Sequence, residues 1–158
     1  MLAAVTQSPG VLTLDELPDP GPPGPQEVLI RPEVVGICGS DLHVYHGELG
    51  ALSGARSFFP RVQGHEFSAI IEAAGQDCPA GLRPGERCGR CAPAAAATRA
   101  GSAARLVHAH QALLASLLTH RFPLAQAQAA IECVVTAADA IKVLVTIDGQ
   151  ADQEERHE

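Results

Sequence analysis

Apolar residues in the first half of the chain come in short runs separated by glycine and proline. The runs LAAVT (residues 2–6) and GVLTLDEL (residues 10–17) are rich in aliphatic and β-branched residues. The longer run Glu27–Ile37 is dominated by valine and isoleucine, and FSAIIEAAG (residues 67–75) repeats the pattern. Short runs of this composition between turn residues are typical of strands in a small barrel or sandwich.

Proline refines this prediction at two places. The run PDPGPPGP, Pro18–Pro25, cannot form a helix or a central strand, so we expect a loop there. Pro32 interrupts the longest apolar run and has no backbone N–H to donate to a neighbouring strand. Its position therefore predicts a bulge or an edge strand.

The second half of the chain has the spacing of helices. In HQALLASLLTH (residues 110–120) the leucines form an i, i+1, i+4, i+5 stripe, which predicts a helix. In PLAQAQAAIECVVTA (residues 123–137) the apolar residues share one face, and Pro123 suits a first helical turn. AIKVLVTI (residues 140–147) then predicts a closing strand. The expected fold is mainly β with α, an α+β arrangement.

Composition and charge narrow the class of protein. With 158 residues, 46% hydrophobic and 18% charged, the chain is expected to fold as a compact domain. Aromatic residues make up only 3%, so the core must consist of alanine, valine, leucine and isoleucine. A formal charge of −7 argues against a nucleic-acid partner or an anionic membrane surface.

The five cysteines and the apolar stretches bear on location. An odd number of widely scattered cysteines is a poor disulfide framework. The N-terminus has no signal-peptide pattern, and the apolar stretch 129–147 contains Glu132, Asp139 and Lys142, which argue against a membrane span. We therefore expect a cytoplasmic protein.

Residues able to bind a metal gather around two short segments, GICGSDLHVYHG and GHE. Cys38, His65 and Glu66 offer a thiolate, an imidazole and a carboxylate, all acceptable zinc donors. Neighbours in a regular strand point to opposite faces, so His65 and Glu66 can share an ion only at an irregular strand entry, for which Gly64 supplies backbone freedom. Spacing alone favours a plainer interpretation, with Cys38 a buried apolar cysteine and His65 a loop histidine.

Several blocks in order along the chain resemble the zinc-dependent medium-chain dehydrogenases, and most closely their sorbitol-, galactonate- and gulonate-type branch. The blocks are VGICGSDLHVYHG, FPRVQGHEFSAIIEAAG, GLRPGER, LLTHRFPLAQAQAAIE and IKVLVTID, together with the opening of the chain. The resemblance covers about residues 1–90 and 111–148. It implies a GroES-like β-barrel with one or two C-terminal helices and a returning strand.

The resemblance also implies roles for particular residues. Cys38, His65 and Glu66 match the catalytic zinc positions, Ser40 matches the hydroxyl that contacts the substrate alcohol, and His43 matches the residue that passes the proton towards solvent. Such a set is chemically coherent, because zinc polarises an alcohol oxygen while a hydroxyl and an imidazole carry the proton away.

Plainer roles stay open for three polar residues. Ser40 is suited to capping a short helix that follows it, and His43 to a simple surface position. Asp41 suits either the orientation of a zinc ligand or an exposed or capping position.

A second, structural zinc site is not expected. Cys88 and Cys91 are two thiols only, too few to close the four-ligand structural zinc site of the resembled family.

The hydride acceptor has no evident binding site in this sequence. The family oxidises a secondary alcohol to a ketone with NAD(P), yet no G-x-G-x-x-G motif is present. We therefore expect residues 1–90 to form the N-terminal part of the catalytic domain. Residues 91–106 would be an alanine-rich junction replacing the nucleotide-binding (Rossmann) domain, 107–149 the C-terminal return and 150–158 a polar tail.

These features leave the activity open. The primary hypothesis is a truncated alcohol or polyol dehydrogenase with impaired turnover, whose partners are a small alcohol or polyol and a second copy or a full-length relative. The alternatives are a GroES-like module that binds a partner without catalysis, and a truncation product without function.

Overall fold

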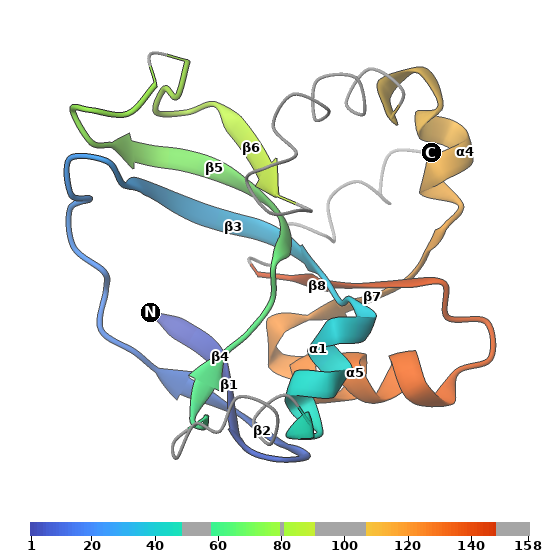
Figure 1. Ribbon diagram of the computed structural model, residues 1–158. Coiled ribbons are helices and arrows are strands. Elements are labelled where there is room, and N and C mark those ends of the chain that lie inside the picture. Colours follow the sequence, from blue (N-terminus) through green and yellow to red (C-terminus); the bar gives the residue numbers. More distant parts are fainter. Residues whose placement is uncertain (49–57, 80, 91–106, 148–158) are drawn as a thin grey trace.

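The computed structural model describes residues 1–48, 58–79, 81–90 and 107–147. The predicted junction 91–106 and tail 150–158 lie outside the described residues. The described strands form a three-stranded sheet, in the order β2-β1-β4, and a five-stranded sheet, in the order β6-β5-β3-β8-β7 (Figure 1). The strands are β1 Leu2–Ser8, β2 Val11–Glu16, β3 Val28–Gly36, β4 Arg61–Val62, β5 Glu66–Ala74, β6 Arg87–Arg90, β7 Leu118–Pro123 and β8 Lys142–Thr146.

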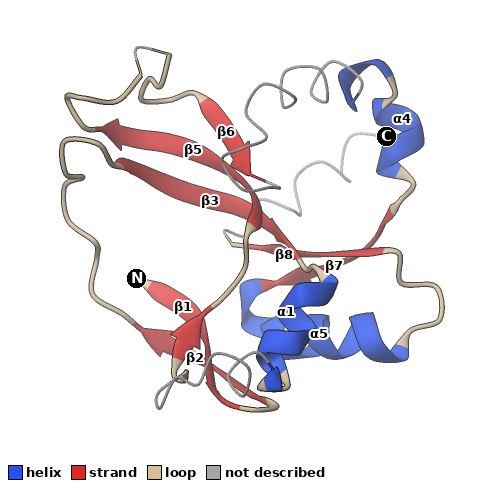
Figure 2. Ribbon diagram, viewed as in Figure 1, coloured by secondary structure: helices blue, strands red, loops and turns tan. Residues whose placement is uncertain are grey.

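Helices are fewer and lie mostly beside one end of the larger sheet (Figure 2). Those that lie wholly within the described residues are α1 Gly39–Tyr45, α4 Gln111–Ala115, α5 Ala127–Thr136 and the 3₁₀ helix η2 Leu124–Gln126. This mainly β architecture with a few helices confirms the predicted fold class. None of the described helices has the length and apolar character needed to span a membrane.

The long apolar run in the first half forms β3, which pairs antiparallel with β5 along its whole length. The pairing register shifts between Pro32 and Val34, as expected where proline cannot donate a hydrogen bond. Among the described strands β8 pairs only with Val34, Val35 and Gly36 of β3, so Pro32 marks a bulge in the part of β3 that pairs with β5 alone. The short strands β4 and β6 were not predicted, because two and four residues give no usable alternation.

The C-terminal half departs from the leucine pattern. The helix predicted over residues 110–120 ends at Ala115, and Leu118 begins β7, which pairs parallel with β8. The leucines bury little apolar surface in the helix that does form, because α4 has no buried residue and Leu113 is 69% exposed. Pairing with β8 therefore outweighs the helical pattern. Pro123 ends β7 and stands before η2, not within a helix as predicted.

The apolar core lies where α5 packs against β8, β7 and β2. Its buried members come from four elements or their ends and are Ile37, Tyr45, Ala130, Ile131, Val143 and Val145. As the composition predicts, the cluster is almost entirely aliphatic. Its one aromatic residue, Tyr45 of α1, donates a hydrogen bond from its hydroxyl to the Gly10 carbonyl at 2.7 Å, which satisfies the buried polar group.

Candidate metal centre

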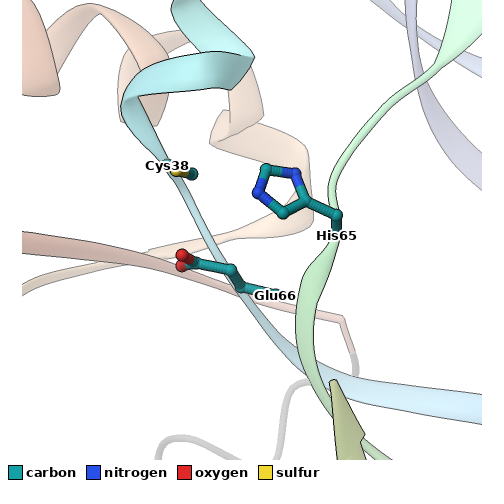
Figure 3. A group of neighbouring side chains, drawn as sticks. All are labelled: Cys38, His65 and Glu66. Carbon is teal, nitrogen blue, oxygen red and sulfur yellow. The ribbon is translucent and has the colours of Figure 1, made fainter. Parts of the chain in front are cut away.

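Cys38, His65 and Glu66 meet where β3 ends and β5 begins. Gly36, the last residue of β3, pairs with Glu66, the first residue of β5. Cys38 follows as the residue before α1, and His65 directly precedes β5. One sulfur, nitrogen or oxygen atom from each of the three side chains lies within 4.8 Å of the others. Figure 3 shows the three side chains directed towards a common space. We refer to them as the donor group.

Two glycines shape the backbone around the donor group. Gly64 has a φ of +115°, a conformation that favours glycine, and it turns the chain so that His65 and Glu66 approach the same space. A Cβ atom on Gly36 would lie 2.9 Å from Oε2 of Glu66, so glycine leaves room for that carboxylate. The predicted irregular strand entry before Glu66 is thus confirmed.

Asp41 connects α1 to the donor group. Its Oδ2 accepts a hydrogen bond from the Cys38 backbone N–H at 2.9 Å, which caps the first turn of the helix. Its Oδ1 lies 3.3 Å from Nδ1 of His65. The two roles proposed for Asp41 from the sequence, capping and orientation, are therefore both compatible with its position. A carboxylate at Nδ1 fixes the imidazole so that Nε2 faces the donor group, as the ring nitrogens in Figure 3 show.

The Cys38 thiol lies in surroundings that favour its charged form. Hydrogen bonds from the hydroxyl and the backbone of Ser40, and a further one with His65, lower the pKa of Cys38. The hydrogen bond with Cys38 raises the pKa of His65, and the charge of Asp41 adds to this shift. Without a metal, these directions favour a thiolate beside an imidazolium. A thiolate is the form of cysteine that binds metals.

Ser40 and His43 both lie on α1, and only Ser40 is adjacent to the donor group. Ser40 Oγ lies 3.4 Å from Nε2 of His65. The residue before α1 is Cys38, so Ser40 lies inside the first turn and is not the helix cap suggested as its plainer role. His43 is 60% exposed, and its Nδ1 hydrogen-bonds the Glu48 carboxylate. Tyr45 and His46, on the same segment, belong to the core and to the surface, respectively.

Lys142 is the residue of this region that the sequence analysis missed. Its Nζ donates to Oε2 of Glu66 at 2.7 Å and to the Ile37 carbonyl at 3.1 Å. Lys142 begins β8, more than seventy residues beyond Glu66. The only sequence signal was a single cation at the start of an otherwise apolar strand.

The chemistry of the donor group fits zinc. One thiolate, one imidazole and one carboxylate are ligands that zinc accepts, and three protein ligands leave a fourth position open. Tetrahedral zinc with ligand distances of about 2.0–2.3 Å places its donors roughly 3.3–3.8 Å apart. Separations of up to 4.8 Å thus require only a small closure of the side chains.

Comparison with known proteins identifies the family to which the chain belongs. Residues 24–120, more than half of the chain, match the family model described as the alcohol dehydrogenase GroES-like domain. The chain therefore belongs to this family, that of the zinc-type medium-chain alcohol and polyol dehydrogenases.

Within the family, the chain is similar to sorbitol dehydrogenases. It is 43% identical to sorbitol dehydrogenase of Homo sapiens over 86 residues, which cover 54% of this chain and 23% of that protein. It is 40% identical to a sorbitol dehydrogenase sequence of Sus scrofa over 87 residues, which cover 54% of this chain and 84% of that sequence. The chain thus spans about a quarter of the length of the human relative (23%).

A similar solved structure is that of alcohol dehydrogenase TADH from Thermus sp. ATN1. It has 35% sequence identity and a TM-score of 0.46, and the match covers 55% of this chain and 23% of that one.

Proposed function

We propose that the chain is the zinc-binding catalytic part of an alcohol or polyol dehydrogenase, with Cys38, His65 and Glu66 as the zinc ligands. The observation that carries the proposal is the convergence of their three donor atoms within 4.8 Å, in a chain of this family. The substrate class is a small secondary alcohol such as a polyol, by analogy with the sorbitol dehydrogenases to which the chain is similar.

Two side chains of α1 would carry the proton released in the proposed reaction. When bound, zinc would polarise the oxygen of an alcohol and so acidify its hydroxyl group. Ser40, whose Oγ lies 3.4 Å from His65 Nε2, would take up that proton while its own hydroxyl proton passes on towards His43. His43 lies one turn further along α1, on the same face of the helix, and is exposed to solvent. Its hydrogen bond with Glu48 holds the imidazole at the surface, where a proton can leave.

The proposal includes a truncation. A dinucleotide-binding domain needs on the order of 100–150 residues. Only residues 91–106 stand between β6 and the segment that leads into α4, where the family resemblance implies such a domain. We therefore expect the chain alone to have negligible dehydrogenase turnover. A cytoplasmic setting completes the proposal, because Cys38 must stay reduced to bind zinc.

Zinc content per folded chain tests the proposed ligands. Native protein, dialysed against metal-free buffer after zinc loading, should retain about one zinc per chain, and Cys38→Ser should retain little. Cys133→Ser is the matched control, since Cys133 is a free cysteine on α5. Equal zinc in the native and Cys38→Ser proteins would remove Cys38 from the site.

Titration with NADH tests the proposed truncation separately. We expect no change in NADH fluorescence on adding the zinc-loaded chain, and no NADH production from sorbitol and NAD⁺. Binding of NADH by the chain would contradict the truncation and support an active enzyme. Absence of both zinc and NADH binding in a folded chain would instead favour a non-enzymatic GroES-like module.

A further inference from the structure

A short segment beside the donor group connects the two sheets. Residues 63–65 lie between β4 and β5 and belong to neither strand, and they lead from the smaller sheet to the larger one (Figure 1). Strand pairing holds the residues on either side of this segment, while Gly64 within it has a positive φ and gives the backbone freedom. Gln63 begins the segment and His65 ends it. The contacts of the Gln63 side chain therefore bear on where His65 lies.

The Gln63 amide contacts β1 through its oxygen and α1 through its nitrogen. Oε1 accepts a hydrogen bond from Oγ1 of Thr6 at 3.1 Å, and Nε2 donates one to the backbone carbonyl of Asp41 at 3.2 Å. Because a carbonyl can only accept a hydrogen bond, the amide nitrogen must face Asp41. The Thr6 hydroxyl donates to the amide oxygen on the other side, so it favours this one orientation of the amide.

Burial makes the hydrogen bond between Thr6 and Gln63 costly to lose. Thr6 is 0% exposed, whereas Gln63 is half-buried. Among the described residues, every buried side-chain nitrogen or oxygen has a hydrogen-bond partner. Without the Gln63 amide, the Thr6 hydroxyl would lose the partner that satisfies it, which destabilises a folded protein.

Asp41 receives the Gln63 hydrogen bond where it also supports two of the proposed ligands. Its carboxylate accepts a hydrogen bond from the Cys38 N–H at 2.9 Å and lies 3.3 Å from Nδ1 of His65. His65 is joined to Gln63 through Gly64. The contacts therefore form a closed ring, from the Gln63 amide to Asp41, on to His65, and back along the chain to Gln63. Such a ring limits how far His65 can move relative to the first turn of α1.

We propose that Gln63 is a positioning residue, which fastens the first turn of α1 to the segment that carries His65. Gln63 thereby sets the spacing between Cys38 and His65, and Thr6 orients the amide that does so. The smaller sheet thus contributes to the zinc affinity of a donor group that lies on the larger sheet. This inference rests on the proposed zinc site.

Zinc affinity and stability, measured on the same variants, test this role. Gln63→Met keeps nearly the length of glutamine but has no amide, so zinc affinity should fall about three- to tenfold, the equivalent of about one hydrogen bond. Its stability in urea, measured without metal, should also fall, because the Thr6 hydroxyl loses its partner. Affinity is measured by competition with a chromophoric chelator.

A double variant separates positioning from a purely structural role. Adding Thr6→Val to Gln63→Met removes the buried hydroxyl as well, and replacing both partners of a hydrogen bond by apolar groups can be nearly neutral. The double variant should therefore recover much of the lost stability. Its zinc affinity should stay as low as that of Gln63→Met, because the bond to the Asp41 carbonyl is still absent.

Two variants of Thr6 and one control sharpen the test. Thr6→Ser keeps the hydroxyl, so zinc affinity should stay near the native value even though loss of a buried methyl group lowers stability. Thr6→Val keeps the volume without the hydroxyl and should lower zinc affinity, since the amide orientation is no longer favoured. Gln7→Met is the matched control: the Gln7 amide donates to Thr13 and Asp15 across β1 and β2, and its loss should leave zinc affinity unchanged.

The outcomes separate this inference from the proposed function. Weaker zinc binding by Gln63→Met and by the stable double variant, with native binding by Thr6→Ser, is the result that we expect. Unchanged affinity in Gln63→Met, or affinity that recovers with stability in the double variant, would overturn the positioning role and leave the zinc site intact. Zinc bound by none of the proteins, the native chain included, would overturn the proposed site and this inference together.

Discussion

The donor group and the flank formed by residues 107–118, which include α4 and the start of β7, differ in the contacts that their side chains make. Around the donor group, Asp41 accepts a hydrogen bond from the Cys38 backbone N–H and lies beside Nδ1 of His65. Lys142 donates a hydrogen bond to the Glu66 carboxylate. On the flank, apolar side chains are exposed instead. They are Val107, Leu113, Leu117 and Leu118, with 54%, 69%, 41% and 37% of their surface exposed.

This difference bears on the proposed truncation. The hydrogen bonds that support the donor group lie within the described residues. The flank exposes leucines at helical spacing, as expected of a surface that a further domain or partner covers. A chain with a supported metal centre beside an uncovered apolar flank is what the proposed truncation would leave.

The largest expected effect contrasts a core residue with a flank residue. Ile131→Ala removes buried volume from the core between α5 and β8 and should lower the free energy of unfolding by about 2–5 kcal/mol. Leu113→Ala, at an exposed position, should change it by no more than about 0.5 kcal/mol. Urea denaturation followed by circular dichroism measures both. A loss of several kcal/mol for Leu113→Ala, and dependence of that loss on protein concentration, would show that a second copy covers the flank.

A smaller effect is expected from Asp41→Asn, which separates orientation from helix capping. Asparagine still accepts the hydrogen bond from the Cys38 N–H, so stability should change little. It places no charge beside His65 Nδ1, so zinc affinity should fall about ten- to a hundredfold. Thermal unfolding and zinc competition titration measure the two quantities. An unchanged zinc affinity would limit Asp41 to its capping role.

The pH dependence of zinc binding gives the most gradual effect. The pKa of His65 is raised from its ordinary value of 6.5, so zinc must displace a proton from the imidazole at pH values above 6.5 as well as below. Zinc affinity should therefore fall about tenfold for each pH unit as the pH drops through this raised pKa. Since Asp41 contributes to the raised pKa, the fall should begin at a lower pH in Asp41→Asn. An affinity independent of pH between 6 and 8 would argue against His65 as a ligand.

The same two regions show what could be predicted from the sequence. Strands β3 and β5 were predicted because each contains a short run of aliphatic and β-branched residues between glycine or proline turns. The convergence of Cys38, His65 and Glu66 was expected from ordered motifs shared with a known family, since spacing alone favoured no site. Gly64 explains locally why His65 and Glu66 can approach the same space, because its positive φ permits the irregular turn before Glu66.

The missed features depend on contacts between distant segments. Lys142 reaches Glu66 only because β8 pairs with β3, and no local pattern reveals such a pairing. The leucines of residues 113–118 follow helical spacing, yet Leu118 belongs to a strand because β8 offers it a partner. At Leu118 a pairing partner far along the chain outweighed the local preference, whereas at Lys142 the strand was predicted and only its neighbour in the sheet was not.

X-ray absorption spectroscopy of the zinc-loaded chain tests the central claim most directly, because it reports the atoms bound to the metal. The proposed site predicts one sulfur at about 2.3 Å and nitrogen or oxygen neighbours at about 2.0–2.2 Å. The sulfur signal should disappear in Cys38→Ser and persist in Cys133→Ser. A native spectrum without sulfur, or one unchanged by Cys38→Ser, would contradict the assignment of this corner of the fold as the zinc site.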